Sequence, residues 1–346
     1  MIDPTNSILH TASVHIIGNK SIEQPLRLSR TPLILEDELL KRSLLTYFLS
    51  NFSTPEYFSF TFSNQDFTLN PLFRFCSGIF DDVDSFHENS VEIAQYLYAS
   101  TNHPNIKSGD LFIARISGIV LDNKSVDGVG IFKSENKDTF LQLGTATPEF
   151  DIFAEEGINI RKLDKGCLVL NVEREAGYKV LIVDNANKSE AQFWKNDFLN
   201  VTPWSDAFHH THNFMNLTRQ YVGDQLEEEF SVSKADKIDL LNRSMNFFKS
   251  KEQFNQNEFE SEVLEDASVI ESFRKYEKTF MTDAEIADNF EISAHAVKLQ
   301  ARVFKTVLKL DKNFHIYIHG NRELIEKGYD EVSRRHYYKL YFDQET

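Results

Sequence analysis

The first two hundred residues alternate between strand-like and helix-like patterns of apolar side chains. Residues 13–19 are rich in β-branched side chains, which favours a strand. Residues 31–52 repeat apolar positions at helical spacing behind a Thr-Pro pair, which suits the start of a helix. A further helix is predicted over 89–101, with its first residue as the cap, whereas 67–80 fits helix and strand equally well.

A series of strand patterns follows, with short polar connections between them. Residues 109–121 and 128–134 flank the polar stretch 122–127, so we expect a hairpin there. Further elements are predicted at 140–144, 157–172 and 178–185 (strands) and at 189–199 (a short helix capped by Ser189). Such short connections favour an antiparallel sheet with helices packed on it, because parallel pairing would need long crossovers. The pattern therefore predicts an α+β fold.

The character of the chain changes after Pro203. Residues 204–308 favour helix almost throughout, and two pairs have the spacing of N-terminal caps, namely Ser233 with Asp236 and Thr282 with Glu285. Residues 313–320 and 336–342 then alternate apolar and polar side chains, which predicts a terminal β-hairpin. We therefore predict two domains: an α+β domain over 1–203, and a helical domain with terminal strands over 204–346.

No sequence motif for catalysis or for binding a cofactor is present. His209, His210 and His212 come closest to a metal-ligand pattern, but neighbours on a helix point about 100° apart, so at most two could share an ion. We expect surface or capping histidines and no metal. Cys76 and Cys167 lie in apolar stretches without a CxxC partner, which predicts buried thiols in a reducing compartment. The sequence thus predicts neither an enzyme nor a cofactor.

Charge is distributed unevenly along the chain. The whole chain carries −16 with a pI near 5.2, which by itself argues against contact with a polyanion. Between Lys298 and Lys339, however, ten basic residues stand against five acidic ones, so this segment carries +5 and the rest of the chain −21. The basic segment is therefore where we expect contact with DNA.

Residues 283–309 have the rhythm of a helix-turn-helix. The packed apolar positions of the motif are taken by Ile286, Phe290, Ile292 and Val297. Ala287 takes the position that the motif reserves for alanine because space is tight there, and Ser293 suits the cap of the second helix. Two positions depart from the motif, because Glu291 stands where the turn prefers glycine and Gln300 where an apolar residue is expected. Since three-helix segments of this kind also occur in proteins that never contact DNA, the motif alone does not decide the function.

The second helix of this segment, expected over 294–309, carries a stripe of cations. Lys298, Arg302, Lys305 and Lys309 stand at i, i+4, i+7 and i+11, one residue after an apolar stripe with the same spacing. If the apolar stripe packs inward, the basic stripe faces solvent and can follow a phosphate backbone. Arg334 and Arg335, near the connection of the two terminal strands, would complete a layout that resembles a winged helix. The alternative is an ordinary solvated face.

Several stretches together resemble the bacterial nucleoid-associated proteins of the NdpA/YejK type. They are GVGIFKS (128–134), DKGCLVLN (164–171), GYKVLIVDN (177–185), QFWKNDFL (192–199), NFEISAHAVKLQARVF (289–304) and LDKNFHIYIHGN (310–321). The resemblance implies a cytoplasmic, nucleoid-associated, DNA-binding protein with no cofactor and no catalytic residues. It supplies no site motif, so no functional residue can be carried over from the family.

Two functions of different classes follow from these patterns. The first is binding of duplex DNA through phosphate contacts, with little base specificity, by the cations of the C-terminal segment. The second is a protein–protein adaptor whose acidic surface attaches it to a DNA-bound nucleoid protein. We expect no membrane span, because no run of eighteen apolar residues occurs, and no secretion signal. The oligomeric state is left open, with a homodimer as one option.

Overall fold

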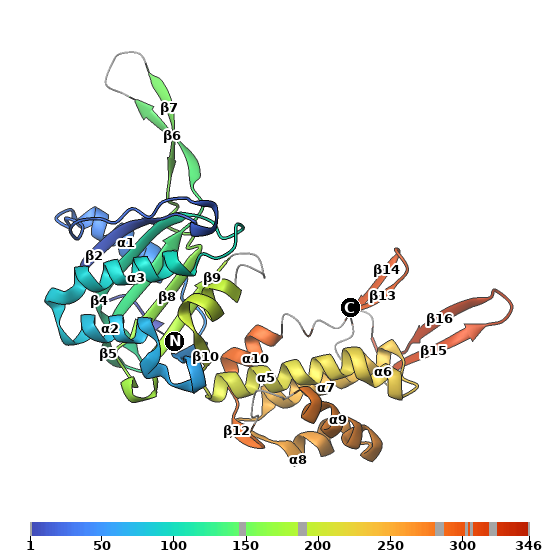
Figure 1. Ribbon diagram of the computed structural model, residues 1–346. Coiled ribbons are helices and arrows are strands. Elements are labelled where there is room, and N and C mark those ends of the chain that lie inside the picture. The colour runs from blue at the N-terminus through green and yellow to red at the C-terminus, as the bar shows by residue number, and fades with distance from the viewer. Residues whose placement is uncertain are drawn as a thin grey trace. The chain divides into compact units, whose positions relative to one another are not determined.

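The structure is a computed structural model that describes residues 2–144, 150–185, 192–280, 287–301, 304, 307–317 and 324–344. The chain divides into two compact units, Met1–Trp204 and Ser205–Thr346. Figure 1 labels the elements of each unit.

The N-terminal unit is built on one large antiparallel sheet. Its strands are β1 (Ile2–Asp3), β2 (Ile8–Ile17), β3 (Tyr57–Phe60), β4 (Gly109–Leu121), β5 (Lys124–Ser134), β8 (Lys165–Leu170), β9 (Lys179–Asp184) and β10 (Val201–Pro203). The spatial order is β1-β4-β5-β8-β9-β3-β10, and β2 also pairs with β4. Every pairing in this sheet is antiparallel. The predicted α+β fold with an antiparallel sheet is confirmed.

The predicted hairpin forms between β4 and β5, but its turn is shorter than the polar stretch 122–127. Only Asp122 and Asn123 lie between the strands, and both have a positive φ, of 49° and 63°. Two left-handed residues give the turn type whose twist matches that of paired strands, and Asn and Asp tolerate this conformation well. The polar residues from Lys124 onward therefore belong to β5.

Among the described residues of this unit, three helices and one π-helical turn cover the sheet. They are α1 (Glu38–Leu49), α2 (Pro71–Asp81), α3 (Phe86–Ser100) and the turn Phe193–Leu199, accompanied by short 3₁₀ turns. The helix predicted over 31–52 starts later than expected, because Asp37 caps it by accepting from the backbone N–H of Leu39 at 2.7 Å. The ambiguous stretch 67–80 forms most of α2, whose cap is Asn70. The predicted cap Asn89 instead lies inside α3 and donates to the carbonyl of Ser85.

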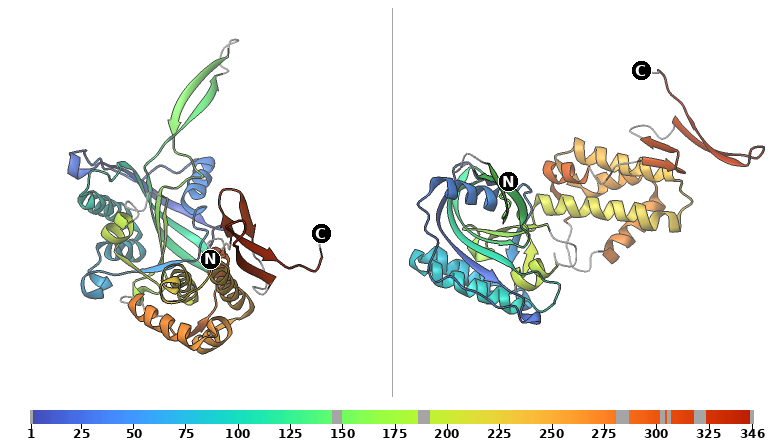
Figure 2. Two further views of the ribbon diagram at one scale, coloured as in Figure 1. Left: turned by 90° about the vertical axis from the view of Figure 1, so that its right-hand side faces the viewer. Right: turned by 90° about the horizontal axis from the view of Figure 1, so that it is seen from above.

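Alternation along the strands gives the sheet two buried faces. One face, with Ile131 and Cys167, packs against α2, α3 and the π-helical turn, where Trp194 is fully buried. The other face packs against α1, where Phe48 stacks on Phe132 with ring centroids 4.4 Å apart. Figure 2 (left) shows α1 on the opposite side of the sheet from α2 and α3. Because both faces are covered, the strands are apolar on both sides.

The strand predicted at 140–144 exists, but it does not join the large sheet. It is part of β6 (Asp138–Gly144), which pairs only with β7 (Asp151–Gly157) in a separate two-stranded ribbon. Figure 1 shows this ribbon extending beyond the strands of the large sheet. The described part of the predicted helix 189–199 forms the π-helical turn, and its expected cap, Ser189, lies outside the described residues.

The C-terminal unit is mainly helical. Its helical segments are α5 (Ala207–Gln220), a π-helical turn (Tyr221–Gln225), α6 (Leu226–Glu229), α7 (Lys234–Ser250), α8 (Gln256–Phe259), a second π-helical turn (Glu260–Leu264), α9 (Ala267–Phe280) and α10 (Ala294–Gln300). The predicted capping box of Ser233 and Asp236 is confirmed at the start of α7, whereas Thr282 and Glu285 lie outside the described residues. The core is rich in phenylalanine and centres on the fully buried Phe214.

The strands that the structure describes in this unit form three short pairs. They are β11 (Gln253–Asn255) with β12 (Asn289–Glu291), β13 (Val307–Leu310) with β14 (Phe314–Tyr317), and β15 (Ile325–Asp330) with β16 (Arg335–Leu340). The strands predicted within 313–320 and 336–342 are confirmed, but each pairs with its immediate neighbour in the chain, so the described residues form two terminal hairpins where one was expected. Tight polar turns cause this: Asp311 adopts a positive φ of 52°, and the Asp330 carboxylate accepts from the backbone N–H of Val332.

Candidate nucleic-acid interface

The helix expected from 294 to 309 is shorter in the structure. α10 ends at Gln300, and Lys309 lies on strand β13. The apolar residues that suggested one helix belong to two cores, since Phe304 packs in the phenylalanine core while Leu308 packs with Ile238 and Ile325. The spacing therefore reflected burial in two places and not one continuous helical stripe.

In the predicted helix-turn-helix, residues 283–286 of the first helix lie outside the described residues, and the described end of that helix is not helical. Residues 289–291, which would end that helix, form strand β12 and pair with β11. Phe290 is buried and stacks on Phe254, with ring centroids 4.5 Å apart. The predicted cap of the second helix is correct, since Ser293 caps α10 by accepting from the N–H of Ala296.

The predicted DNA-contacting cations are spread over separate elements. Lys298 is exposed on α10, Lys309 is exposed on β13, and Arg334 and Arg335 are exposed at the turn and first residue of the β15–β16 hairpin. Arg302 and Lys305 lie outside the described residues. The cations with a described position thus belong to one helix and two β-hairpins. Whether they can contact one DNA duplex together depends on the tertiary structure.

The β13–β14 hairpin has one apolar face and one cationic face. Leu308 and Leu310 point inward with Ile316, whereas the opposite face carries Val307, Lys309, His315 and Tyr317. Lys309 and His315 are direct cross-strand neighbours, and Tyr317 is 61% exposed. This second face, which we call the cationic ribbon face, contains no carboxylate, so nothing on it opposes an approaching phosphate.

The β15–β16 hairpin is more nearly neutral. Lys339 forms an ion pair with Glu326 at 3.8 Å, and Arg335 stands directly opposite Asp330. The side chain of Lys339 also lies 4.9 Å from the ring centroid of Tyr341. The cations of this ribbon therefore have acidic neighbours that the cationic ribbon face lacks.

Lys298 lies on a groove of about 760 Å³ between α7, β11, β12 and α10. The groove is lined by apolar side chains such as Phe248 and Val297, by Lys249, Lys251 and Lys298, and by Glu252 and Glu291. Lys251 is held by Glu258 and Glu262 at 3.3 and 2.9 Å, and its hydrogen bond to Glu262 raises its pKa. Within the described residues, Lys249 and Lys298 are exposed and have no ion pair.

Sequence reasoning missed a buried row of polar residues in the N-terminal unit. Successive cross-strand partners place His15, Leu111, Lys133, Lys165 and Asp184 side by side across β2, β4, β5, β8 and β9. The histidine and both lysines are at most 1% exposed. Burial of two neighbouring ammonium groups is costly unless carboxylates and carbonyls compensate it.

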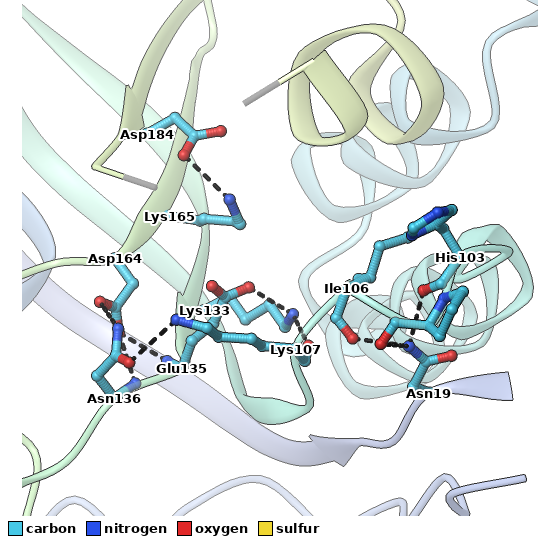
Figure 3. A network of polar contacts seen from close by, with 11 residues as sticks. Asn19, His103, Ile106, Lys107, Lys133, Glu135, Asn136, Asp164, Lys165 and Asp184 are labelled. Atoms are coloured by element: carbon cyan, nitrogen blue, oxygen red, sulfur yellow. Dashed lines mark hydrogen bonds and ion pairs between the residues drawn. The ribbon is translucent and has the colours of Figure 1, made fainter. Parts of the chain in front are cut away.

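That compensation is shown in Figure 3. Lys133 donates to Glu135 at 2.7 Å and to the carbonyl of Lys107 at 2.5 Å, while Lys165 lies 3.0 Å from Asp184. Asp164 accepts from the backbone N–H groups of Glu135 and residue 136, at 2.7 and 3.0 Å. The network therefore ties the end of β5 to the strands on either side and to the base of the β6–β7 ribbon.

Beside this network, the buried Asn19 side chain organises a loop. Its amide donates to the carbonyls of His103 and Ile106, at 2.9 and 2.7 Å (Figure 3). The signal for the two buried lysines was present in the sequence, because period-two alternation places Lys133 on the face of Ile131, and Lys165 on the face of Cys167. Each lysine stands where an apolar residue would be expected. The row holds strands together, and its amines and carboxylates are engaged with each other.

His15 makes the stability of this row dependent on pH. Burial, with the nearby ring of His87, lowers the pKa of His15 to about 4, whereas an unfolded histidine titrates near 6.5. Between pH 6.5 and 4 the unfolded chain therefore binds a proton at His15 that the folded chain does not bind. The contribution of the neutral His15 to the free energy of unfolding is complete above pH 6.5 and declines as the pH falls toward 4. We expect His15→Gln to flatten this part of the urea-unfolding profile, and the exposed-site variant His10→Gln to leave it unchanged. An unchanged slope in His15→Gln would contradict the assignment.

The three clustered histidines have partners within the C-terminal unit. His209 bonds to the Asn213 amide, His210 lies 3.1 Å from the Ser205 hydroxyl, and His212 stacks on Phe208. Burial lowers the pKa of His209. In the part of the chain that the structure describes, no group of three histidine, cysteine or acidic side chains is placed to hold a metal ion.

Two further predictions concern burial and membranes. Cys76 and Cys167 are both free and buried, as the sequence predicted, and burial raises the pKa of each thiol. No helix among the described residues is long and apolar enough to span a membrane.

The sequence profile of a protein family described as nucleoid-associated protein YejK matches residues 13–337. The match covers most of the chain and confirms the resemblance carried by the six stretches. No curated protein matches the chain. The family is not a family of enzymes, and it assigns the chain a role at the nucleoid. This chain therefore belongs to the family of nucleoid-associated protein YejK.

Proposed function

We propose that this chain binds duplex DNA without sequence specificity through the cations of its C-terminal segment. The proposed contacts are Lys298, Arg302, Lys305, Lys309, Arg334 and Arg335. The observation that carries this proposal is the cationic ribbon face, an exposed cross-strand pair of Lys309 and His315 beside Tyr317 with no carboxylate. It lies in the one segment that carries +5 in a chain whose remainder carries −21.

The shape and chemistry of this face favour contact with the phosphate backbone. A two-stranded ribbon is narrow enough to approach a DNA groove, and exposed cations release the counterions condensed on the duplex. The described contacts offer no paired Asn or Arg side chains arranged to read base edges. The acidic remainder of the chain repels DNA, so binding is confined to the C-terminal segment.

The test is a paired charge reversal, Lys298→Glu with Lys309→Glu. Both side chains are exposed, on α10 and on β13, so the folded chain should tolerate the changes. We expect duplex affinity to fall by about ten- to a hundred-fold, and the slope of log affinity against log salt to decrease by about two, because each phosphate contact contributes about one. Binding is measured by fluorescence anisotropy with a labelled duplex of mixed sequence over 50–200 mM salt.

The matched control is Lys20→Glu with Lys124→Glu, which makes the same change in net charge at exposed positions of the N-terminal unit. This control should bind DNA with nearly unchanged affinity and salt slope. If both double variants lose affinity equally, net charge and not the C-terminal segment decides binding. If the first variant binds like the parent, these cations are not the site.

A second candidate function is favoured by the acidic remainder of the chain. A surface balance of −21 suits a basic protein partner, through which the chain would reach the nucleoid as an adaptor. The same titration separates the two functions. An adaptor would show no binding of the parent chain to duplex DNA at any salt concentration, and its recovery with nucleoid proteins would survive nuclease treatment.

A further inference from the structure

The last strand, β16, alternates cations and aromatic rings on one of its faces. Arg335, Tyr337 and Lys339 stand two residues apart on the strand. Tyr341 continues the alternation just beyond it, since its backbone N–H donates to the carbonyl of Leu324 at 2.8 Å. Alternate residues of a strand point to the same side, roughly 7 Å apart. Arg335, Tyr337, Lys339 and Tyr341 therefore form one row, which we call the tyrosine–cation row.

The ring of Tyr337 lies over a glycine on the neighbouring strand. Gly328 is the cross-strand partner of Tyr337, and a Cβ atom added there would lie 2.3 Å from the Cζ and hydroxyl oxygen of the tyrosine. Any larger residue at 328 would push the ring away, so the glycine lets it cross β15 closely. The tyrosine nevertheless remains 43% exposed. The ring thus rests on the hairpin and keeps an outer surface on which another flat ring can stack.

The two carboxylates on this side of the hairpin are already engaged. Glu326 accepts from the Tyr341 hydroxyl at 2.8 Å and pairs with Lys339 at 3.8 Å. Asp330 accepts from the Ser333 hydroxyl at 2.6 Å, and this bond lowers the pKa of its carboxyl group. Two cations thus stand beside two carboxylates, so attraction of phosphate by charge alone is weak here. The exposed tyrosine rings are what distinguishes this side of the hairpin.

We propose that the tyrosine–cation row binds single-stranded nucleic acid, with unpaired bases stacked on Tyr337 and Tyr341 and with Arg335 and Lys339 beside the sugar–phosphate backbone. Aromatic rings combined with cations hold single strands without reading their sequence, because every base has a flat face that can stack. The bases of a duplex are stacked on one another and cannot reach such a ring. The two tyrosines therefore play no part in the duplex contacts proposed above.

The nature of the row favours a single strand over an acidic protein partner. Recognition of an acidic protein surface rests on complementary net charge, which this side of the hairpin lacks. The base of the hairpin is fixed, since Ile325 is buried against Ile238 of α7 and Leu308 of β13. Figure 1 shows β15 and β16 running outward from the helices of the same unit. The row is thereby presented to solvent on an anchored hairpin.

Fluorescence anisotropy of the full chain with labelled oligo-dT and with an abasic strand of the same length tests the proposal. The two probes share a sugar–phosphate backbone, and only oligo-dT carries bases. We expect the parent to bind oligo-dT about tenfold more tightly than the abasic strand, because only bases can stack. Tyr337→Ala should remove most of this difference and leave the affinities for the abasic strand and for a mixed-sequence duplex unchanged. Oligo-U should respond as oligo-dT does, since stacking does not depend on the sugar.

Two variants serve as controls, and circular dichroism confirms that each one folds. Tyr337→Phe keeps the ring and should bind oligo-dT like the parent. Tyr329→Ala removes a ring that is 52% exposed on the opposite face of the same hairpin, where it pairs with His336, and it should also bind like the parent.

Three outcomes would overturn the proposal. The first is equal affinity of the parent for oligo-dT and the abasic strand, which would mean that phosphate charge alone decides binding. The second is an unchanged affinity of Tyr337→Ala for oligo-dT. The third is an equal loss in Tyr337→Ala and Tyr329→Ala, which would reflect a general disturbance of the hairpin. The duplex probe reports on the proposed duplex function separately, so failure of that function is distinguishable from failure of the tyrosine–cation row.

Discussion

Replacing Glu135 by leucine is expected to lower the free energy of unfolding of the N-terminal unit by about 3–5 kcal/mol. The Lys133 ammonium is fully buried and loses the carboxylate that lies 2.7 Å from it, and that carboxylate is itself only 2% exposed. Water cannot replace the lost partner at such a depth, so the desolvation cost of the ammonium is then offset only in part, by neighbours such as the Lys107 carbonyl. Urea unfolding followed by tryptophan fluorescence measures the effect, because both tryptophans lie in this unit.

The double variant Lys133→Met with Glu135→Leu distinguishes a buried charge from lost packing. It removes both members of the ion pair and keeps side chains of similar volume, so we expect it to recover most of the lost stability. Lys133→Met alone should be destabilising, because it leaves the Glu135 carboxylate without its ammonium partner. A double variant that is as unstable as the sum of the single variants would show that the two side chains act independently.

Replacing Phe214 by alanine is expected to destabilise the C-terminal unit by about 3–5 kcal/mol. Phe214 is fully buried, and its ring lies 4.3 Å from that of Phe254 and 4.9 Å from that of Phe259, measured between centroids. Alanine leaves a cavity that rigid neighbouring rings cannot fill. The matched control is Phe314→Ala, which removes a ring that is 62% exposed and should change the stability by less than about 0.5 kcal/mol.

The same variant tests the predicted division into domains at residues 203–204. Far-ultraviolet circular dichroism reports both units, whereas tryptophan fluorescence reports only the N-terminal one. Phe214→Ala should shift the unfolding transition seen by circular dichroism and leave the fluorescence transition in place. A shift of both transitions by the same amount would mean that the two units unfold as one.

Local patterns predicted the elements well where a single core decided the burial. The alternation over 109–134 located the β4–β5 hairpin, and the spacing of Ser233 and Asp236 located the start of α7. Prediction failed where apolar residues at helical spacing serve different cores. Val297 and Leu308 are the example, since one packs in the phenylalanine core and the other beneath the terminal hairpins. A one-dimensional period cannot distinguish one stripe from two separate contacts.

The candidate site was predicted less completely than the fold. The sequence located the basic segment, because charge can be counted without a structure. It assigned the cations to a helix, whereas Lys309 stands on a strand beside His315. The ribbon pairing that joins these two side chains depends on the turn at Asp311, whose left-handed backbone is not evident from the local pattern.

The sequence by itself determined the fold class, the family and the excess of positive charge near the C-terminus, because these depend on composition, periodicity and short strings. Only the tertiary structure decided that Lys309 shares a ribbon face with His315, that Lys133 and Lys165 are buried neighbours, and that β6 and β7 stand apart from the large sheet. The physical reason is the same in each case. Strand pairing joins residues that are distant along the chain, and the burial of a side chain depends on which side chains those paired strands place against it.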